Sequence, residues 1–488
     1  MIVFILGHKF HFETENLCRL FFPNADIKLS YEYKETTDDF LYTEMISSKD
    51  AIVLKARIKV GESCHESELT IDEYSDETAE YVLALCVYEC LQKVTGYTPK
   101  WGLLTGVRPS KLMSKLIDQY GQDGARAYFI HKLLVSEQKT KLASTVCNVQ
   151  KPIIDKNTPK SFSLYISIPF CPSRCSYCSF VSHSITSANA KKLFPEYLDK
   201  LIEELEITGK IAKDNALILE SVYVGGGTPG ILSAEQTVKL INAVKDNFEM
   251  SPCREFTFEA GRADVTTFEK LSVLSELGVD RISINPQTFD NSVLEEIGRK
   301  HTAQDAIEAY NCARQFDFNS INMDLIAGLP SDTVEGFKSS IDTAISLKPE
   351  NITVHSLALK RSSNLVAKDN VSLAQDNSAD KMIDYANEAL SAAGYVPYYM
   401  YRQTRCVGNL ENVGWALKGK ECIYNIFMMD EIHTVLAVGA GAVTKLKEPY
   451  GAYIERIFNF KYPYEYNSRF DELIKRKARI SEFYATYN

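Results

Sequence analysis

The sequence predicts an α/β protein whose central part is an open (β/α)6 sheet, equivalent to a partial TIM barrel. Between residues 163 and 359, six strand-like segments alternate with segments whose apolar positions recur at helical spacing. Helices of this length between strands imply right-handed crossovers and a parallel sheet. Six units are fewer than the eight of a closed barrel, so we expect an open sheet with its chemistry at the C-terminal ends of the strands.

The elements of this central part follow one another without long gaps. The expected strands lie at 163–170, 221–227, 255–260, 280–287, 320–330 and 351–359. The expected helices between them lie at 194–212, 235–248, 268–278, 303–316 and 336–347.

For the rest of the chain, the sequence predicts an α+β N-terminal domain over residues 1–150 and a C-terminal extension over 356–488. The first contains short strands around a helix near 13–22, the alternating run 51–60, and a long helix at about 76–94. Cys86 and Cys90 lie four apart on that helix and favour apolar packing over metal binding. The polar stretch 151–161 is the expected linker to a core over 161–355. The extension contains an expected helix at 379–393 and the aromatic run YVPYYMYRQ, and we expect it to cover the substrate.

Composition restricts the classes of partner. A chain of 488 residues with 45% hydrophobic and 24% charged residues is typical of a globular protein with more than one domain. The formal charge of −10 argues against nucleic-acid binding, which needs a basic face. We expect no membrane span, and we interpret the opening MIVFIL as a strand. Twelve cysteines, scattered apart from one group and without an export signal, indicate a cytoplasmic protein with reduced thiols.

The grouped cysteines follow the first core strand in YISIPFCPSRCSYCSF. Cys171, Cys175 and Cys178 have the spacing Cys-x3-Cys-x2-Cys. A structural zinc site normally takes four protein ligands, for which His183 is the nearest fourth candidate. Three thiolates on a four-iron cluster instead leave one iron open to a substrate or cofactor. Both alternatives are open at this point, and the cluster gives the missing fourth cysteine a chemical use.

The next strands also end in polar or glycine-rich residues. VYVGGGTPG ends the second strand, and consecutive glycines allow the backbone to approach a small polar ligand and present N–H groups to it. The following strand ends carry Glu259, Gln287 and Asp324, and Arg299 follows Gln287. Such a set of side chains suits the ribose, amino and carboxylate groups of a nucleoside-like cofactor.

These motifs resemble the radical S-adenosylmethionine (SAM) superfamily. YISIPFC, GGGTP, the Gln287 strand, Arg299 and DLIAGLP resemble oxygen-independent coproporphyrinogen III oxidase over residues 163–359. AVGAGA (437–442) is a weaker match. TGVRPSKL, YMYRQ and GNLENVGW make the whole chain similar to the HemZ-type branch of coproporphyrinogen dehydrogenase-like proteins. The resemblance implies a radical SAM oxidoreductase of tetrapyrrole metabolism.

The resemblance also implies cofactors and roles. Cys171, Cys175 and Cys178 would hold a [4Fe–4S] cluster, and SAM would chelate its open iron. Reductive cleavage of SAM gives a 5′-deoxyadenosyl radical, which in the family removes hydrogen from two propionates of coproporphyrinogen III and leads to protoporphyrinogen IX. Positions serving the cluster-bound SAM are matched by Tyr165, Tyr177, Gly226 and Glu259. Positions around a second SAM are matched by Gly227, Thr228, Gln287, Arg299, Asp324 and Ala358.

One departure leaves the reaction open. The oxidase has a further cysteine where this chain has Phe180, and relatives that handle haem share a phenylalanine there. The alternatives are a haem-binding chaperone or a haem-modifying radical SAM protein. The implied partners are a tetrapyrrole, either coproporphyrinogen III or haem, and a low-potential electron donor such as flavodoxin or ferredoxin. His355 is a candidate haem ligand, Arg402 a candidate pocket residue, and Arg262 with Asp264 an expected surface salt bridge.

Overall fold

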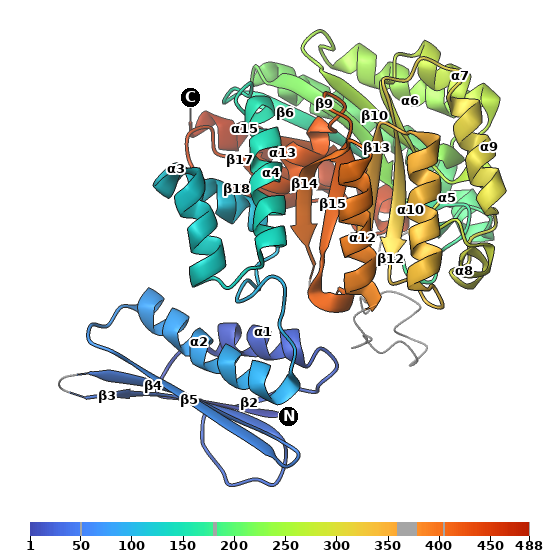
Figure 1. The fold of residues 1–488 in the computed structure, drawn as a ribbon. Coiled ribbons are helices and arrows are strands. Elements are labelled where there is room, and N and C mark those ends of the chain that lie inside the picture. Colours follow the sequence, from blue (N-terminus) through green and yellow to red (C-terminus); the bar gives the residue numbers. More distant parts are fainter. Residues whose placement is uncertain (49–50, 179–182, 359–377, 404–405, 488) are drawn as a thin grey trace. The chain divides into compact units, whose positions relative to one another are not determined.

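The computed structural model describes residues 1–488 except 49–50, 179–182, 359–377, 404–405 and 488 (Figure 1). The chain forms two compact units. The first comprises Met1–Ser144 with Arg402–Arg405, and the second comprises Thr145–Tyr401 with Cys406–Asn488. The division into 1–150, 161–355 and 356–488 stays a prediction.

The N-terminal unit contains a five-stranded sheet in the order β2-β1-β3-β4-β5. β1 pairs in parallel with β2 and β3, whereas β3, β4 and β5 pair antiparallel. Leu54, Ala56 and Ile58 alternate along β4 and are buried in the core that the sheet forms with α1 and α2. The bounds are β1 Ile2–Leu6, α1 His11–Phe21, β2 Lys28–Ser30, β3 Phe40–Ser47, β4 Ile52–Val60, β5 Ser63–Ile71 and α2 Asp76–Thr95.

The long helix predicted near residues 76–94 is confirmed as α2. The hydroxyl of Ser75 caps its N-terminus, and Gly96 ends it with a φ of 67°. Cys86 and Cys90 are fully buried in the core of this unit, as apolar packing predicts.

The predicted linker is only partly right. α3 (Pro109–Ala127), the π-helical turn Tyr128–Lys132 and α4 (Glu137–Ile154) follow the sheet. α4 thus continues through Lys151 and Pro152, which were expected to lie outside a helix. Ile153 and Ile154 pack against a buried apolar cluster that includes Tyr424 and Phe427, so packing outweighs the local preference of proline.

The second unit is built on an 11-stranded sheet, in the order β14-β15-β13-β12-β11-β10-β9-β6-β16-β17-β18. β6, β9, β10, β11, β12 and β13 are parallel and adjacent in chain order, which confirms the (β/α)6 prediction. The helices between them cover the sheet (Figure 1). The strand bounds are β6 Ser161–Ile168, β9 Ile218–Gly226, β10 Glu255–Gly261, β11 Arg281–Ile284, β12 Ser320–Ala327 and β13 Asn351–Ser356. The helix bounds are α5 Ala188–Asp214, α6 Ala234–Asn247, α7 Phe268–Glu276, α8 Asn291–Glu296, α9 Ala303–Ala313 and α10 Val334–Leu347.

The C-terminal part extends this sheet at both edges. β15 pairs antiparallel with β13, and β16 pairs in parallel with β6. The aromatic run forms β14, the terminal strand of the sheet. The bounds are α12 Ser378–Ala392, β14 Val396–Arg402, β15 Glu411–Ala416, α13 Ile423–Asp430, β16 Thr434–Val438, β17 Val443–Lys447, β18 Ile454–Phe458, α14 Pro463–Ser468 and α15 Phe470–Ala485.

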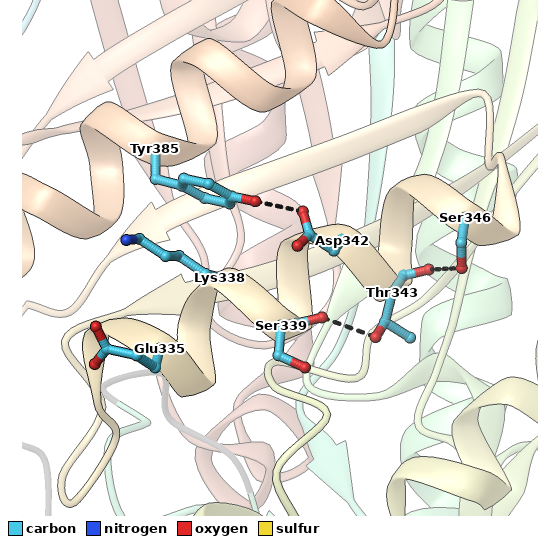
Figure 2. Close-up of a pocket in the computed structure, with 7 residues that line it drawn as sticks. All are labelled: Glu335, Lys338, Ser339, Asp342, Thr343, Ser346 and Tyr385. Carbon is cyan, nitrogen blue, oxygen red and sulfur yellow. Dashed lines mark hydrogen bonds between the residues drawn. The ribbon is translucent and has the colours of Figure 1, made fainter.

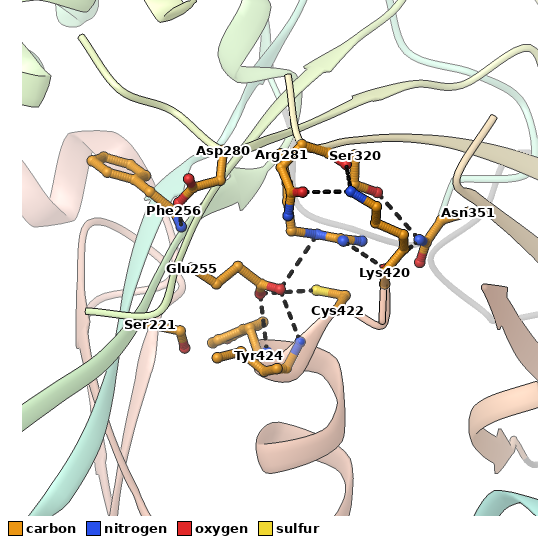
Figure 3. A network of polar contacts seen from close by, with 12 residues as sticks. Ser221, Glu255, Phe256, Asp280, Arg281, Ser320, Asn351, Lys420, Cys422 and Tyr424 are labelled. Carbon is orange, nitrogen blue, oxygen red and sulfur yellow. Dashed lines mark hydrogen bonds and ion pairs between the residues drawn. The ribbon is translucent and has the colours of Figure 1, made fainter. Parts of the chain in front are cut away.

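A buried polar network fastens α13 to the N-terminal ends of the parallel strands (Figure 3). Glu255, the first residue of β10, accepts hydrogen bonds from Cys422 Sγ at 3.2 Å and from the backbone N–H groups of Ile423 and Tyr424 at 2.9 and 3.2 Å. Arg281, the first residue of β11, lies 3.4 Å from the same carboxylate. The network lies at the end of the sheet opposite the strand ends that carry the predicted site.

None of the helices in the described residues combines the length and apolar character that a membrane crossing requires.

Candidate functional site

The three grouped cysteines lie on a loop that leaves the C-terminal end of β6. Cys171 ends the short strand β7 (Phe170–Cys171), which pairs with β8 (His183–Ser184). Cys171 and Cys175 are buried, and Cys178 is half-buried. The loop is held by the N–H of Ile185 on the carbonyl of Cys171 at 2.9 Å and by that of Cys178 on Cys175 at 3.2 Å. Within the described ranges, no three His, Cys, Asp or Glu side chains are placed to share one metal ion.

The glycine turn supports this loop through its backbone. The N–H groups of Gly227 and Thr228 donate to the carbonyls of Ile168 and Phe170, both at 2.8 Å. A Cβ at Gly227 would lie 2.5 Å from the Phe170 carbonyl oxygen, so only glycine allows this approach. Gly226 has a φ of 109°. The expectation that these N–H groups face a ligand is therefore wrong for Gly227 and Thr228, because the strand before the cysteine loop uses them.

A stack of tyrosines lies beside Glu259. The rings of Tyr165 on β6 and Tyr223 on β9 stack at a centroid distance of 6.3 Å, and Tyr424 lies 4.4 Å from Tyr223. The Tyr223 hydroxyl donates to Glu259 Oε1 at 2.5 Å. Burial raises the pKa of Glu259 to about 7; the hydrogen bond from Tyr223 opposes this shift, and the charge of Asp324 adds to it. Glu259 therefore exchanges a proton near neutral pH.

Arg299 joins the cysteine loop to the loop after β11. Its Nη2 donates to the hydroxyl of Tyr177 at 2.9 Å, and its Nη1 donates to the carbonyl of Asn285 at 3.3 Å. Tyr177 lies between Cys175 and Cys178, so the guanidinium is held next to the cysteine loop. Two of the predicted site residues are thus in direct contact.

Gln287 and Asp324 are joined through the backbone. Gln287 is buried with a φ of 72°, its N–H donates to the carbonyl of Asp324 at 2.9 Å, and its carbonyl accepts from Ile326 at 2.9 Å. A non-glycine residue with positive φ stores backbone strain, which is typical of functional sites.

The Asp324 carboxylate has partners within the protein. Asn322 Nδ2 donates to it at 2.8 Å, and His355 Nε2 lies 3.8 Å away. Burial alone would raise the pKa of Asp324, but His355 and the hydrogen bonds of Asn322 and Thr353 outweigh it and keep the pKa below its usual value. Asp324 is therefore ionised at neutral pH, and His355 faces this carboxylate.

Two of the remaining predicted residues lie next to core strands, one falls outside the described residues, and Arg402 belongs to the N-terminal unit. Ala358 follows β13 and pairs with Cys406. His183 lies on β8 beside the ring of Phe170, and burial lowers its pKa. Phe180 falls in 179–182, outside the described residues. Arg402 donates to the carbonyl of Leu104 at 2.5 Å and lies over the ring of Trp101.

Buried polar atoms near the cysteine loop indicate whether an iron–sulfur cluster and a nucleoside cofactor could bind there. Four buried polar atoms on or next to the cysteine loop have no hydrogen-bond partner among the residues that the structure describes: Ser176 Oγ, His183 Nε2, Asn285 Oδ1 and Arg299 Nε. Buried polar groups are normally hydrogen-bonded, so these atoms indicate a polar group bound from outside. Together with three thiols on one loop, they fit the two groups.

A groove on the outer helices lies apart from the predicted site residues. It is lined by α10 and by Tyr385 of α12 (Figure 2). Tyr385 donates to Asp342 at 2.7 Å, and the Lys338 ammonium lies 5.3 Å from the Tyr385 ring. These contacts connect two surface helices, and none of the predicted site residues takes part in them.

Sequence reasoning missed several polar residues around the loop. Tyr223 could have been found, because it is one of the alternating residues of β9 before the glycines. Asn285 could also have been found, because it directly follows β11. Arg262 was wrongly expected on the surface: it is only 3% exposed, and its contact with the cysteine loop depends on tertiary structure.

Comparisons with known proteins identify the family of the chain. Residues 165–344 match the model of the radical SAM superfamily. Over 97% of its length, the chain is 34% identical to the oxygen-independent coproporphyrinogen-III oxidase-like protein HemZ of Bacillus subtilis, of which 96% is covered. It is 33% identical to the heme chaperone HemW of the same organism, over 62% of this chain and 77% of that protein.

A solved structure shows the same fold. Coproporphyrinogen III oxidase (HemN) from Escherichia coli superposes with a TM-score of 0.52 at 21% identity, covering 67% of this chain and 72% of that one. Radical SAM proteins use a [4Fe–4S] cluster and SAM, and these are the cofactors of this chain. The chain belongs to the radical SAM superfamily and, within it, to the family of oxygen-independent coproporphyrinogen-III oxidase-like proteins that includes HemZ.

Proposed function

We propose that this protein catalyses the oxidative decarboxylation of coproporphyrinogen III to protoporphyrinogen IX. In this proposal Cys171, Cys175 and Cys178 hold the [4Fe–4S] cluster. The observation that carries the proposal is the contact of Arg299 with Tyr177 at 2.9 Å, because it puts a cation of the predicted second cofactor site against the cluster loop.

The cluster-bound SAM is assigned to the side of the loop that faces β9 and β10. Tyr165, Tyr177, Gly226 and Glu259 contribute to its site. Glu259 as a carboxylate accepts hydrogen bonds from the cofactor, and the ring of Tyr165 provides a flat apolar wall. The bond from Tyr223 keeps the Glu259 carboxylate in one orientation.

A second SAM site is assigned to the side that faces β11 and β12, with Gln287, Arg299, Asp324 and Ala358. Gly227 and Thr228 contribute to it through atoms other than their backbone N–H groups, which donate to Ile168 and Phe170. Arg299 suits a carboxylate, and ionised Asp324 suits ribose hydroxyl groups. The strained backbone of Gln287 fixes the distance between this strand end and Asp324.

When bound, the reduced cluster supplies the electron that cleaves SAM. For each propionate converted to a vinyl group, one hydrogen atom of the β-carbon ends in 5′-deoxyadenosine, the carboxylate leaves as CO2, and one electron passes to a one-electron acceptor. The residues of this chain bind and orient the reagents and exclude water, because the cofactors provide the reactivity. A low-potential donor such as flavodoxin or ferredoxin is proposed as the source of electrons for the cluster.

Handling of haem is the second candidate function. It is favoured by the heme chaperone HemW of Bacillus subtilis, to which the chain is 33% identical. In that case the protein would bind haem and leave the macrocycle unchanged. The decarboxylation proposal is supported by the presence of Gln287, Arg299 and Asp324 together, on or after the neighbouring strands β11 and β12, because a protein that only carries haem would have less need of this set.

Isotope transfer separates the two functions. Reduced, reconstituted protein is incubated anaerobically with SAM and coproporphyrinogen III deuterated at the propionate β-carbons. We expect deuterium in the 5′-deoxyadenosine, and none with the matched Cys175→Ser variant. Deoxyadenosine without deuterium, together with stoichiometric haem binding by the same preparation, would favour the haem-handling function.

A further inference from the structure

The cysteine loop is held by a buried ion pair outside the cofactor site. Arg262 follows β10 directly, and its side chain is 4% exposed. Its Nε and Nη2 donate to the two oxygens of Asp264 at 2.9 and 2.8 Å. Its remaining nitrogen, Nη1, donates to Ser173 Oγ at 2.8 Å and to the Ser173 carbonyl at 3.3 Å. Ser173 lies between Cys171 and Cys175.

The same contacts continue to the loop that carries Arg299. Ser173 Oγ, which accepts from Arg262, donates to the carbonyl of Gly298 at 3.4 Å, and the N–H of Ser176 donates to the carbonyl of Ile297 at 3.0 Å. His301, which is 4% exposed, lies 3.8 Å from the Asp264 carboxylate through Nδ1. Three loops that follow β6, β10 and β11 are thus joined at one point.

From this geometry we propose that Arg262 is a positioning residue that fixes the cysteine loop and couples it to the loop of Arg299. The inference rests on the proposed assignment of the cluster to this loop. The planar guanidinium of Arg262 binds both oxygens of Asp264 and keeps its third nitrogen for Ser173. Its orientation is therefore fixed, which the ammonium group of a lysine cannot reproduce. The desolvated pair therefore holds Ser173, and with it Cys171 and Cys175, in place before any cofactor binds.

The test uses the protein without its cofactors. Cys171 and Cys175 are buried, so they react with an alkylating reagent only when the cysteine loop opens. Full-length Arg262→Lys, Ser173→Ala and the double variant are treated with iodoacetamide, and modification of Cys171 and Cys175 is followed by peptide mass spectrometry. Arg254→Lys is the matched control: Arg254 precedes the same strand, and its Nε donates to Glu220 at 2.6 Å at the opposite end of β10.

We expect alkylation of both cysteines to be about tenfold faster in Arg262→Lys, equivalent to about 1.4 kcal/mol of lost loop stabilisation. Ser173→Ala should also accelerate it, and the double variant should be no faster than Arg262→Lys, because both changes remove the same contact. Additive effects, unchanged rates, or an equal acceleration in Arg254→Lys would each overturn the proposal. Cys422, which is buried at the opposite end of β10, reports global unfolding.

A spectroscopic readout follows reconstitution. Arg262→Lys should bind iron and sulfide but give a broadened electron paramagnetic resonance signal for the reduced cluster, since the loop samples more than one arrangement. A signal identical to that of the unmodified protein would contradict the positioning role. Neither readout depends on porphyrin turnover, so the failure of decarboxylation with intact coupling would contradict only the proposed function.

Discussion

The hydroxyl of Tyr223 donates a hydrogen bond to Oε1 of Glu259 across 2.5 Å, between neighbouring parallel strands. The acceptor is a half-buried carboxylate, and its removal from water raises its pKa to about 7. A small change around this pair therefore changes the charge of Glu259 at neutral pH.

Glu259 should make SAM binding depend on pH. Because its pKa is raised, the carboxylate that accepts hydrogen bonds forms only as the pH rises through about 7, so SAM affinity should increase from pH 6 to pH 8. Glu259→Gln should retain iron and sulfide, bind SAM about tenfold more weakly at pH 8 and lose the pH dependence. Equilibrium dialysis with labelled SAM measures this. Lost iron with unchanged SAM affinity would contradict the assigned role.

Tyr223→Phe should move this pH dependence upward. The hydrogen bond from Tyr223 lowers the pKa of Glu259, whereas burial and the charge of Asp324 raise it. Removing the hydrogen bond should therefore raise the pKa of Glu259 further. The midpoint of SAM binding should rise by about one pH unit, which corresponds to a hydrogen bond worth about 1.4 kcal/mol. The same dialysis series gives the midpoint. A midpoint that stays in place or falls would show that Tyr223 does not act on Glu259.

The cluster should depend on the three loop cysteines. Alanine at Cys171, Cys175 or Cys178 removes one thiolate, so reconstituted protein should lose the brown absorbance and most of its iron and sulfide. Cys253→Ala and Cys312→Ala are the controls, since both cysteines are outside the loop and should leave cluster content unchanged. Full iron content in Cys175→Ala would refute the ligand assignment.

The network on Glu255 should contribute to stability, not to chemistry. Arg281→Met leaves a buried carboxylate without its cation, and such a loss costs about 3–5 kcal/mol of unfolding free energy. Arg479→Met is the control, because the Arg479–Glu455 pair is partly exposed and its loss should change the unfolding free energy much less. Urea unfolding of the apoprotein, followed by circular dichroism, compares them. Equal losses of unfolding free energy in the two variants would mean that Arg281 does not stabilise the buried Glu255 carboxylate.

The strands and the cysteine loop were predictable because their signals are local. Apolar residues recur at every second position along β6, β10, β11 and β12, and the spacing of Cys171, Cys175 and Cys178 needs no tertiary information. The roles of Arg262 and of the glycine N–H groups could not be predicted, since both depend on which loop packs against them. The linker prediction placed Pro152 outside a helix, but the packing of Ile153 and Ile154 keeps α4 helical beyond it.

Product analysis tests the proposed reaction most directly. Reduced protein is incubated anaerobically with SAM and coproporphyrinogen III, and the products are oxidised and separated by chromatography. The proposal predicts protoporphyrin together with one 5′-deoxyadenosine for each vinyl group formed. Deoxyadenosine with unchanged coproporphyrin, in protein that binds haem tightly and stoichiometrically, would contradict it.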